Sequence, residues 1–333
     1  MTIKKARRRC RTRECRKPIT LAVDVKVKYW YCRDCRPDLW PEKLTRPKPV
    51  RTNLSWPPII AEAKRIAESY DTDVTLRQLF YRLVSAQLIP NTQSKYTYLS
   101  SQTAEARRDG TFPDLIDNTR EIHGGGGRFD NSPADALQEA LEDAVEFYSR
   151  NHTEGQDVSI FLGVEKRGTV AQLQRWFGDY DFPILALGGY ASQSYVRDVV
   201  RAVESYDRPA VLLYAGDHDP SGWDIPRDFV ERTNCWKEVK RVALTPEQVA
   251  QYELPEAFGK EKDTRKTGFV RRFGKNVQVE LDALPPDVLR QLYADAIGKF
   301  WDTSKFDAVM AREDEEREEL ERLVDELVES DDS

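Results

Sequence analysis

The sequence predicts an α/β protein whose largest domain is a parallel β-sheet with helices on both faces. Between residues 156 and 310, short and almost entirely apolar segments alternate with amphipathic ones. This is the pattern of strands that are buried on both faces and joined by covering helices. A cysteine-rich segment and a stretch of helical periodicity precede them. The chain of 333 residues is therefore expected to contain several domains.

Four of the five cysteines lie close to the N-terminus, as a C-x4-C pair and a C-x2-C pair separated by sixteen residues. Two such pairs bring four thiolates around one tetrahedral Zn²⁺. The intervening segment 18–31 alternates like a pair of strands, so residues 1–50 are expected to form a zinc ribbon around a structural Zn²⁺. Disulfides are the alternative, although the odd fifth cysteine, Cys235, argues against them. The predicted zinc ligands are Cys10, Cys15, Cys32 and Cys35.

The net charge of −6 conceals a strong asymmetry along the chain. Residues 1–51 hold seventeen Lys and Arg against five acids, whereas residues 311–333 hold twelve acids against three Arg. A basic arm on an acidic protein suits contact with nucleic-acid phosphates, and a solvated basic tail is the alternative. Leu and Val at helical spacing predict that the acidic residues 311–333 form a C-terminal helix that ends in a solvated tail.

Two further segments lie between the ribbon and the sheet. Residues 51–128 are predicted to form a mainly helical domain, and residues 129–155 a linker that contains one amphipathic helix. The sheet domain, 156–310, has predicted strands at 158–164, 182–187, 210–216 and 240–244. The helices predicted between these strands cover 169–179, 192–206 and 223–233.

Acidic residues follow two of the predicted strands directly. Glu165 ends the first strand, and Asp217 and Asp219 end the third. The carboxyl ends of parallel strands form one edge of the sheet, where ligands bind. In an extended chain, residues two apart face the same way, so Asp217 and Asp219 are expected on one side and His218 on the other. Like charges need compensation, and oxygen ligands suit Mg²⁺ or Mn²⁺. We therefore predict that these three acids bind Mg²⁺; a helix cap and an Asx turn are the alternative.

These acids resemble the metal-binding motifs of the Toprim fold. Glu165 resembles the first of these motifs and the segment "DHDPSG" the second. The Pro and Gly after the second Asp are similar to those in catalytic A subunits of topoisomerase VI and their meiotic double-strand-break relatives. The segment "GGYASQSYVR" resembles the strand, loop and helix between them, with Ala191 where proline is expected. "VELDALPP" also resembles a family segment, in which Glu280 and Asp282 are expected to have structural roles.

The helical segment 75–87 carries a candidate nucleophile. Tyr81 lies about 130° from the centre of the apolar stripe, on the polar side, and Arg77 precedes it by four residues. An exposed tyrosine beside an arginine suits attack on phosphate, because the guanidinium holds phosphate oxygens and favours the phenolate. An ordinary surface tyrosine is the alternative.

The motif around this tyrosine extends the resemblance. "RQLFY", residues 77–81, is similar to the R-[acid]-[aliphatic]-[aromatic]-Y motif of topoisomerase VI A subunits, whose tyrosine attacks DNA, with Gln78 in place of the acid. The resemblance covers residues 58 to about 300 and is greatest with the compact stand-alone relatives called Mini-A. It implies a winged-helix (CAP-like) DNA-binding domain, whose helix carries Arg107 and Arg108, ahead of the Toprim domain. Lys166 and Arg167 either follow the DNA backbone or are surface charges.

The function that this resemblance implies is Mg²⁺-dependent DNA cleavage by a transesterase of the topoisomerase class, with a 5′-phosphotyrosyl intermediate. The implied partners are double-stranded DNA and a second copy of the chain. No nucleotide-binding motif is found, so strand passage would need a separate ATPase subunit. The alternatives are a hydrolytic Toprim nuclease and a non-catalytic, zinc-containing DNA-binding protein. Without an apolar run of membrane length or a secretory signal, a cytoplasmic protein is expected.

Overall fold

The computed structural model describes residues 5–9, 15, 18–22, 54–116, 131–257, 266–274 and 277–331. The chain divides into two compact units, Met1–Leu54 and Ser55–Ser333. None of the helices in the described ranges has an apolar stretch long enough to cross a membrane.

The first unit contains a two-stranded antiparallel sheet of β1 (Lys5–Arg9) and β2 (Pro18–Ala22). The alternating pattern predicted a strand at the position of β2, which is confirmed. Its partner among the described residues is β1, which precedes it in the chain, rather than a segment that follows it. Of the predicted zinc ligands, Cys10, Cys32 and Cys35 lie outside the described residues. The zinc ribbon therefore stays a prediction.

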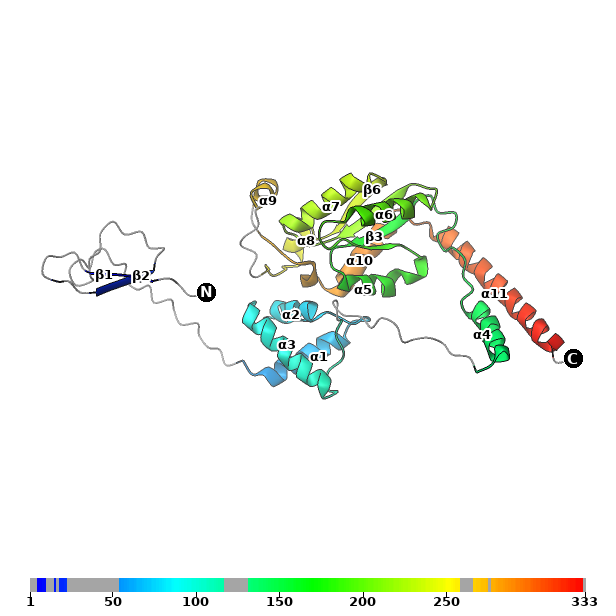
Figure 1. Cartoon of the computed structure of the whole chain (residues 1–333), viewed down its shortest axis with the longest axis horizontal. Coiled ribbons are helices and arrows are strands. Elements are labelled where there is room, and N and C mark those ends of the chain that lie inside the picture. Colours follow the sequence, from blue (N-terminus) through cyan, green and yellow to red (C-terminus); the bar gives the residue numbers. More distant parts are fainter. Residues whose placement is uncertain are drawn as a thin grey trace. The chain divides into compact units, whose positions relative to one another are not determined.

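The second unit begins with three helices, which lie together below the sheet in Figure 1. They are α1 (Trp56–Glu68), α2 (Leu76–Ser85) and α3 (Gln93–Arg108). The start of α2 is defined by a capping box, in which the Thr75 hydroxyl accepts from the Gln78 amide and the Gln78 side chain accepts from the Thr75 amide. Residues 109–116 after α3 contain no strand, and residues 117–130 lie outside the described ranges. A wing is therefore not shown.

The sheet of the second unit has four parallel strands in the order β4-β3-β5-β6. Both central strands are apolar and buried throughout, because helices cover both of their faces. The edge strand β6 is longer than predicted, and its exposed residues alternate with partly buried ones in its first half. The α/β class and the parallel sheet are thus confirmed. The strands are β3 (Ser159–Val164), β4 (Ile184–Ala186), β5 (Ala210–Ala215) and β6 (Trp236–Ala243).

Two helices pack on each face of this sheet, which forms the central layer (Figure 1). On one face, side chains of β3 and β5 such as Phe161 and Leu212 pack against α6 (Gln193–Glu204) and α7 (Pro220–Thr233). The other face is covered by α5 (Gly168–Phe177) and α10 (Pro286–Ile297). The remaining short elements are η2 (Gly178–Tyr180), α8 (Pro246–Gln251), α9 (Lys266–Phe273) and η3 (Leu281–Ala283).

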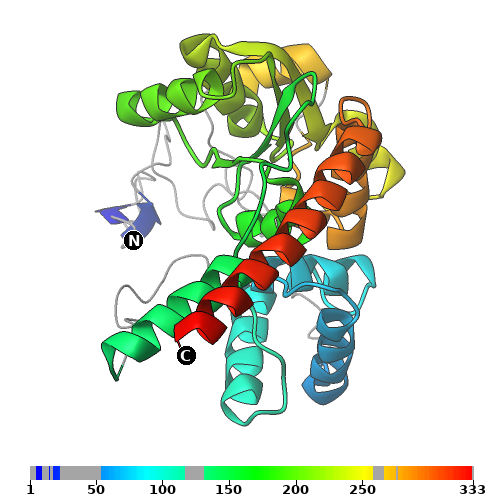
Figure 2. The ribbon, with the colours of Figure 1, turned by 90° about the vertical axis from the view of Figure 1, so that its right-hand side faces the viewer.

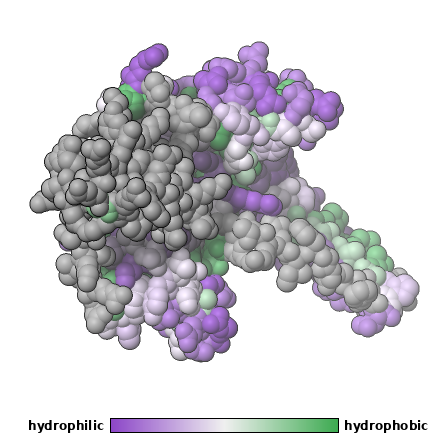
Figure 3. Space-filling model, turned by 60° about the vertical axis from the view of Figure 1, so that its left-hand side comes forward, coloured by the Kyte–Doolittle hydropathy of each residue, from purple (hydrophilic) through white to green (hydrophobic). Residues whose placement is uncertain are grey.

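Two helices, α4 (Pro133–Glu146) and α11 (Thr303–Asp331), lie side by side as a two-helix arm (Figure 2). The predicted acidic helix is confirmed, but it begins at Thr303 rather than at residue 311, so its first turns belong to the region assigned to the sheet domain. Figure 3 shows apolar surface on this arm among hydrophilic residues. Leu137 and Phe147 are 59% and 71% exposed there.

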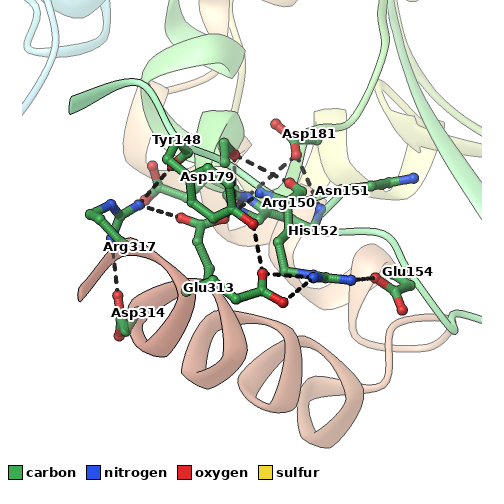
Figure 4. Close-up of polar contacts among 12 residues, drawn as sticks. Tyr148, Arg150, Asn151, His152, Glu154, Asp179, Asp181, Glu313, Asp314 and Arg317 are labelled. Carbon is green, nitrogen blue, oxygen red and sulfur yellow. Dashed lines mark hydrogen bonds and ion pairs between the residues drawn. The ribbon is translucent and has the colours of Figure 1, made fainter. Parts of the chain in front are cut away.

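A buried ion-pair cluster attaches α11 to the segment that follows α4 (Figure 4). The Glu313 carboxylate accepts from the His152 ring at 2.8 Å, from the Arg150 amide at 2.7 Å and from Arg317 at 2.6 Å. The other ring nitrogen of His152 lies 2.6 Å from the Asp179 carbonyl oxygen. Because both ring nitrogens face acceptors, the geometry is that of a protonated imidazolium.

This cluster predicts a pH-dependent stability. Burial of the ring opposes protonation of His152, but the bonds to Glu313 and Asp179 outweigh it, so its pKa is raised. Burial likewise opposes ionisation of Glu313, but its three donors hold its pKa at about 2. The histidine contribution is full below about pH 6.5 and is lost as pH rises through the raised pKa. The Glu313 contribution is lost only as pH falls from about 4.5 towards 2.

Urea denaturation of the wild type and of His152→Gln, measured from pH 5 to 9, tests this prediction. The difference in unfolding free energy between the two proteins should shrink as pH rises. His218 does not interfere in this range, because burial lowers its pKa to about 4. A difference that is constant from pH 5 to 9 would show that folding does not raise the pKa of His152.

Candidate functional site

The three acids predicted to bind metal come together at the carboxyl edge of the sheet. In the order β4-β3-β5-β6, the chain passes from β3 to β4 on one side and then to β5 on the other. The switch point of the sheet, where open α/β folds form their sites, therefore lies between β3 and β5. Glu165 follows β3, and Asp217 and Asp219 follow β5. These carboxylates therefore lie at the ends of the two central strands, as predicted.

Backbone contacts fix the three carboxylates relative to one another. The amide of Asp217 donates to Glu165 Oε2 at 2.7 Å. Asp219 caps α7, and its Oδ1 accepts from the Gly222 amide at 2.7 Å. Burial, together with the negative charges of Asp217 and Asp219, raises the pKa of Glu165 to about 7. The site thus holds more negative charge than its surroundings stabilise.

A buried arginine supports the loop that carries the two aspartates. Arg241 of β6 donates to the carbonyl oxygens of Gly216, Asp217 and Gly222 at 2.6–2.8 Å, and to that of Leu244 at 2.9 Å. Burial lowers its pKa to about 10, so it stays charged at neutral pH. Arg241 therefore positions the backbone of the acid loop. Its role could not be predicted from the sequence, because a single arginine in an edge strand carries no local signal.

The close approach of α7 to the acids depends on a glycine. A Cβ on Gly222 would lie 2.2 Å from the carbonyl oxygen of Asp217 and 3.0 Å from Glu165 Oε2. Since backbone cannot move aside as a flexible side chain can, Gly222→Ala should destabilise the protein by about 2–3 kcal/mol. Gly178→Ala is the matched control, because no atom lies within 4 Å of its Cβ position. Urea denaturation should show the loss in the first variant only; equal stabilities would contradict this packing.

A second pair of acids lies beside the first. His218 and Val279 form an antiparallel bridge, with N–O distances of 2.8 and 3.0 Å, which brings Glu280 and Asp282 next to the acid loop. The amide of Leu281 donates to Asp217 Oδ1 at 2.8 Å. The ring of His218 points away from the acids, as predicted, and lies against Phe269 and Phe273 of α9.

Lys166 connects the two acid pairs. Its ammonium lies 3.3 Å from Asp217 Oδ1, 3.2 Å from Glu280 Oε2 and 3.2 Å from Asp282 Oδ2. Burial opposes its charge, but the three carboxylates outweigh this and raise its pKa. The surface alternative weighed for Lys166 is therefore wrong, because the side chain is mostly buried in an ion-pair network. Glu280 and Asp282, for which structural roles were expected, both lie beside the candidate site and form ion pairs there. Their acid-x-acid spacing, like that of "DHD", was the signal available in the sequence.

Helix α2, which carries Arg77 and Tyr81, packs directly onto this second acid pair. Arg77 Nη2 donates to Glu280 Oε1 at 2.5 Å, and its Nε pairs with Oε2. Arg82 donates to the carbonyl of Ala283. Gln78, which replaces the acid of the family motif, is buried and donates to Gln172 of α5 at 3.0 Å. The helical pattern predicted that this face of α2 is exposed to solvent. It instead contacts α5 and the segment that carries Glu280 and Ala283.

The predicted exposure of Tyr81 is therefore wrong. Its side chain is fully buried, and its hydroxyl has no hydrogen-bond partner of normal geometry among the described residues. Burial raises the pKa of Tyr81 to about 12; Glu280 adds to the rise, while Arg77 and Lys166 oppose it. In this conformation the tyrosine is a neutral phenol beside the ion-pair network.

The remaining predicted DNA contacts lie on exposed or partly exposed positions. Arg107 and Arg108 occupy the last turn of α3, where Arg107 donates to the carbonyl of Thr103. Arg167 is exposed at the start of α5. Their contact with DNA stays a prediction.

The donors that could hold a metal ion are carboxylate oxygens of Glu165, Asp217 and Asp219. Within the described ranges, no three His, Cys, Asp or Glu side chains form a ready-made coordination sphere. The chemistry of the donor set nevertheless suits a hard divalent cation, since all three side chains are carboxylates, and burial together with the charges of Asp217 and Asp219 raises the pKa of Glu165. Models of known protein families and curated proteins contain no match to this chain.

Proposed function

We propose that this protein is a DNA-cleaving transesterase in which Tyr81 attacks a backbone phosphate and Glu165, Asp217 and Asp219 bind Mg²⁺. One observation carries the proposal. A continuous ion-pair chain, Arg77–Glu280–Lys166–Asp217, joins the tyrosine helix to the acid edge of the sheet. Arginine, tyrosine and clustered carboxylates are the groups that phosphoryl transfer to a protein hydroxyl requires.

The reaction exchanges one phosphodiester bond for another. The Tyr81 oxygen forms a bond to phosphorus, and the bond from phosphorus to the 3′ oxygen breaks. The phenol loses its proton and the leaving 3′ oxygen gains one, so that a 5′-phosphotyrosine and a 3′-hydroxyl result. Arg77 binds non-bridging phosphate oxygens and stabilises the phenolate. A divalent cation on the acids supplies stabilisation of the charge that develops on the phosphate and the leaving oxygen.

The resemblance implies a homodimer in which the tyrosine of one protomer works with the acids of the other. Within a single chain, α2 already contacts the segment that carries Glu280 and Asp282. We propose that this contact is a resting arrangement and that it opens for DNA, because a buried neutral phenol cannot reach a phosphate. Double-stranded DNA and, if strands are passed, a separate ATPase subunit are the proposed partners.

Trapping a covalent complex tests the function. End-labelled duplex DNA is incubated with the protein and Mg²⁺ or Mn²⁺, and the reaction is stopped with detergent. The expected product is DNA with protein on its 5′ ends, which protease digestion converts to a faster-migrating species. Free 5′-phosphates would instead indicate a hydrolytic nuclease, and binding without cleavage a non-catalytic DNA-binding protein.

A further inference from the structure

The carboxylate of Glu280 occupies an anion position formed by two cations. Both of its oxygens pair with the guanidinium of Arg77, and Oε2 also lies 3.2 Å from the ammonium of Lys166. The Glu280 side chain is only 4% exposed, whereas those of Arg77 and Lys166 are 32% and 23% exposed. The carboxylate thus lies beneath two cations that remain partly open to solvent.

A carboxylate and a phosphodiester make the same demands on such a position. Each carries one negative charge and presents two oxygens to the planar fork of an arginine. Replacing one by the other leaves the charge balance of the cluster unchanged. The position lies between the proposed nucleophile and the proposed metal ligands. Arg77 is one helical turn from Tyr81, and Lys166 contacts Asp217.

We propose that Glu280 occupies, in the free protein, the place of the DNA phosphate on Arg77 and Lys166, and that DNA displaces it. This inference rests on the proposed function and adds its regulation. While Glu280 is in place, Arg77 is neutralised and α2 is held against η3, so Tyr81 stays covered. When a phosphate takes the position, the ion pair that holds α2 is broken and Arg77 is bound to the group that the tyrosine attacks.

Binding of a 25-base-pair DNA duplex, measured in chelator and in a Tyr81→Phe background so that no cleavage occurs, tests the proposal. Glu280→Gln keeps the shape of the side chain and removes its charge, so it should tighten DNA binding about tenfold. Asp282→Asn is the matched control. It removes the same charge from the same cluster and also takes one carboxylate partner from Lys166, but it leaves the pair between Arg77 and Glu280 intact. Its effect should stay below about threefold.

Hydrogen exchange of the wild type gives a second measurement, which does not depend on the folding of a variant. The amides of Leu281 and Ala283 are bonded to Asp217 and to the Glu280 carbonyl. Saturating duplex should speed their exchange as Glu280 leaves, while amides of β3 stay unchanged. The proposal is overturned if these amides keep their protection with DNA bound, or if Glu280→Gln binds DNA no more tightly than Asp282→Asn.

The two proposals fail separately. Tighter binding by Glu280→Gln without any covalent complex in the wild type would leave the anion position standing and reject DNA cleavage. A covalent complex in the wild type with equal binding by the two variants would reject the role of Glu280 alone.

Discussion

Replacing Tyr81 by phenylalanine should abolish the covalent protein–DNA complex, with a loss of at least about 10³-fold in its rate of formation. The change removes only the hydroxyl that forms the bond to phosphorus. That hydroxyl is buried and lacks a hydrogen-bond partner among the described residues, so stability should change by less than about 1 kcal/mol. DNA binding in chelator should also be preserved. Detergent-trapped complex and urea denaturation, measured on the same preparation, separate chemistry from folding.

Tyr96→Phe is the matched control for this variant. Tyr96 lies on α3, its ring packs edge-on against Phe80, and the Arg77 guanidinium lies 5.7 Å from its centroid. It therefore shares the surroundings of Tyr81, but we give it no role in bond formation. Covalent complex should form with Tyr96→Phe and not with Tyr81→Phe. If Tyr81→Phe cleaves DNA as fast as the wild type, Tyr81 is excluded as the nucleophile and hydrolysis at the acid site is favoured.

Replacing Glu165 by glutamine should change stability in opposite directions without and with metal. In chelator, the folded protein disfavours the Glu165 carboxylate, whose pKa is raised to about 7 by burial and by its acidic neighbours. Stability contributed by the protonated form is lost as pH rises from about 4.5 through 7, by about 3 kcal/mol in total. Glu165→Gln should escape this loss, so it should be more stable than the wild type at pH 8 and similar to it at pH 4.5.

Millimolar Mg²⁺ or Mn²⁺ should reverse this order. A cation that binds the folded state raises the unfolding free energy of the wild type by mass action, by about 2.7 kcal/mol at a hundred times its Kd, and so raises the melting temperature. Glu165→Gln should lose most of this response, and the exposed Glu204→Gln should keep it. A melting curve of the wild type that does not move with saturating Mn²⁺ would count against a metal site. A full response in Glu165→Gln would exclude Glu165 as a ligand.

Local pattern was sufficient to predict the sheet and its acid edge. The apolar segments around Phe161 and Leu212 fall in the strands β3 and β5, because a strand buried on both faces needs apolar residues at every position. Glu165 and Asp217 follow from the same pattern. A carboxylate directly after a central parallel strand lies at the ligand-binding edge of the sheet, and this does not depend on the conformation of the loops that follow.

Long-range packing decided what the pattern could not. Helical periodicity assigns one apolar face to α2, and this face is buried against α1 and α3. The face with Arg77 and Tyr81 is polar enough to look solvent-exposed, yet it is covered by residues about two hundred positions later in the chain. An ion pair compensates the burial of a charged side chain, so hydropathy cannot reveal such an interface.

The sequence by itself determined that an arginine and a tyrosine share a helix and that three acids end two neighbouring strands. Only the tertiary structure decided that Arg77 and Asp217 belong to one ion-pair network, through Glu280 and Lys166, and that Tyr81 is covered. The bridge between His218 and Val279 brings Glu280 to Arg77 and Lys166, and Glu280 lies 203 residues from Arg77 in sequence. The reason is physical. Periodicity reports which side of an element is apolar, whereas the partner of a charged side chain depends on how distant segments pack.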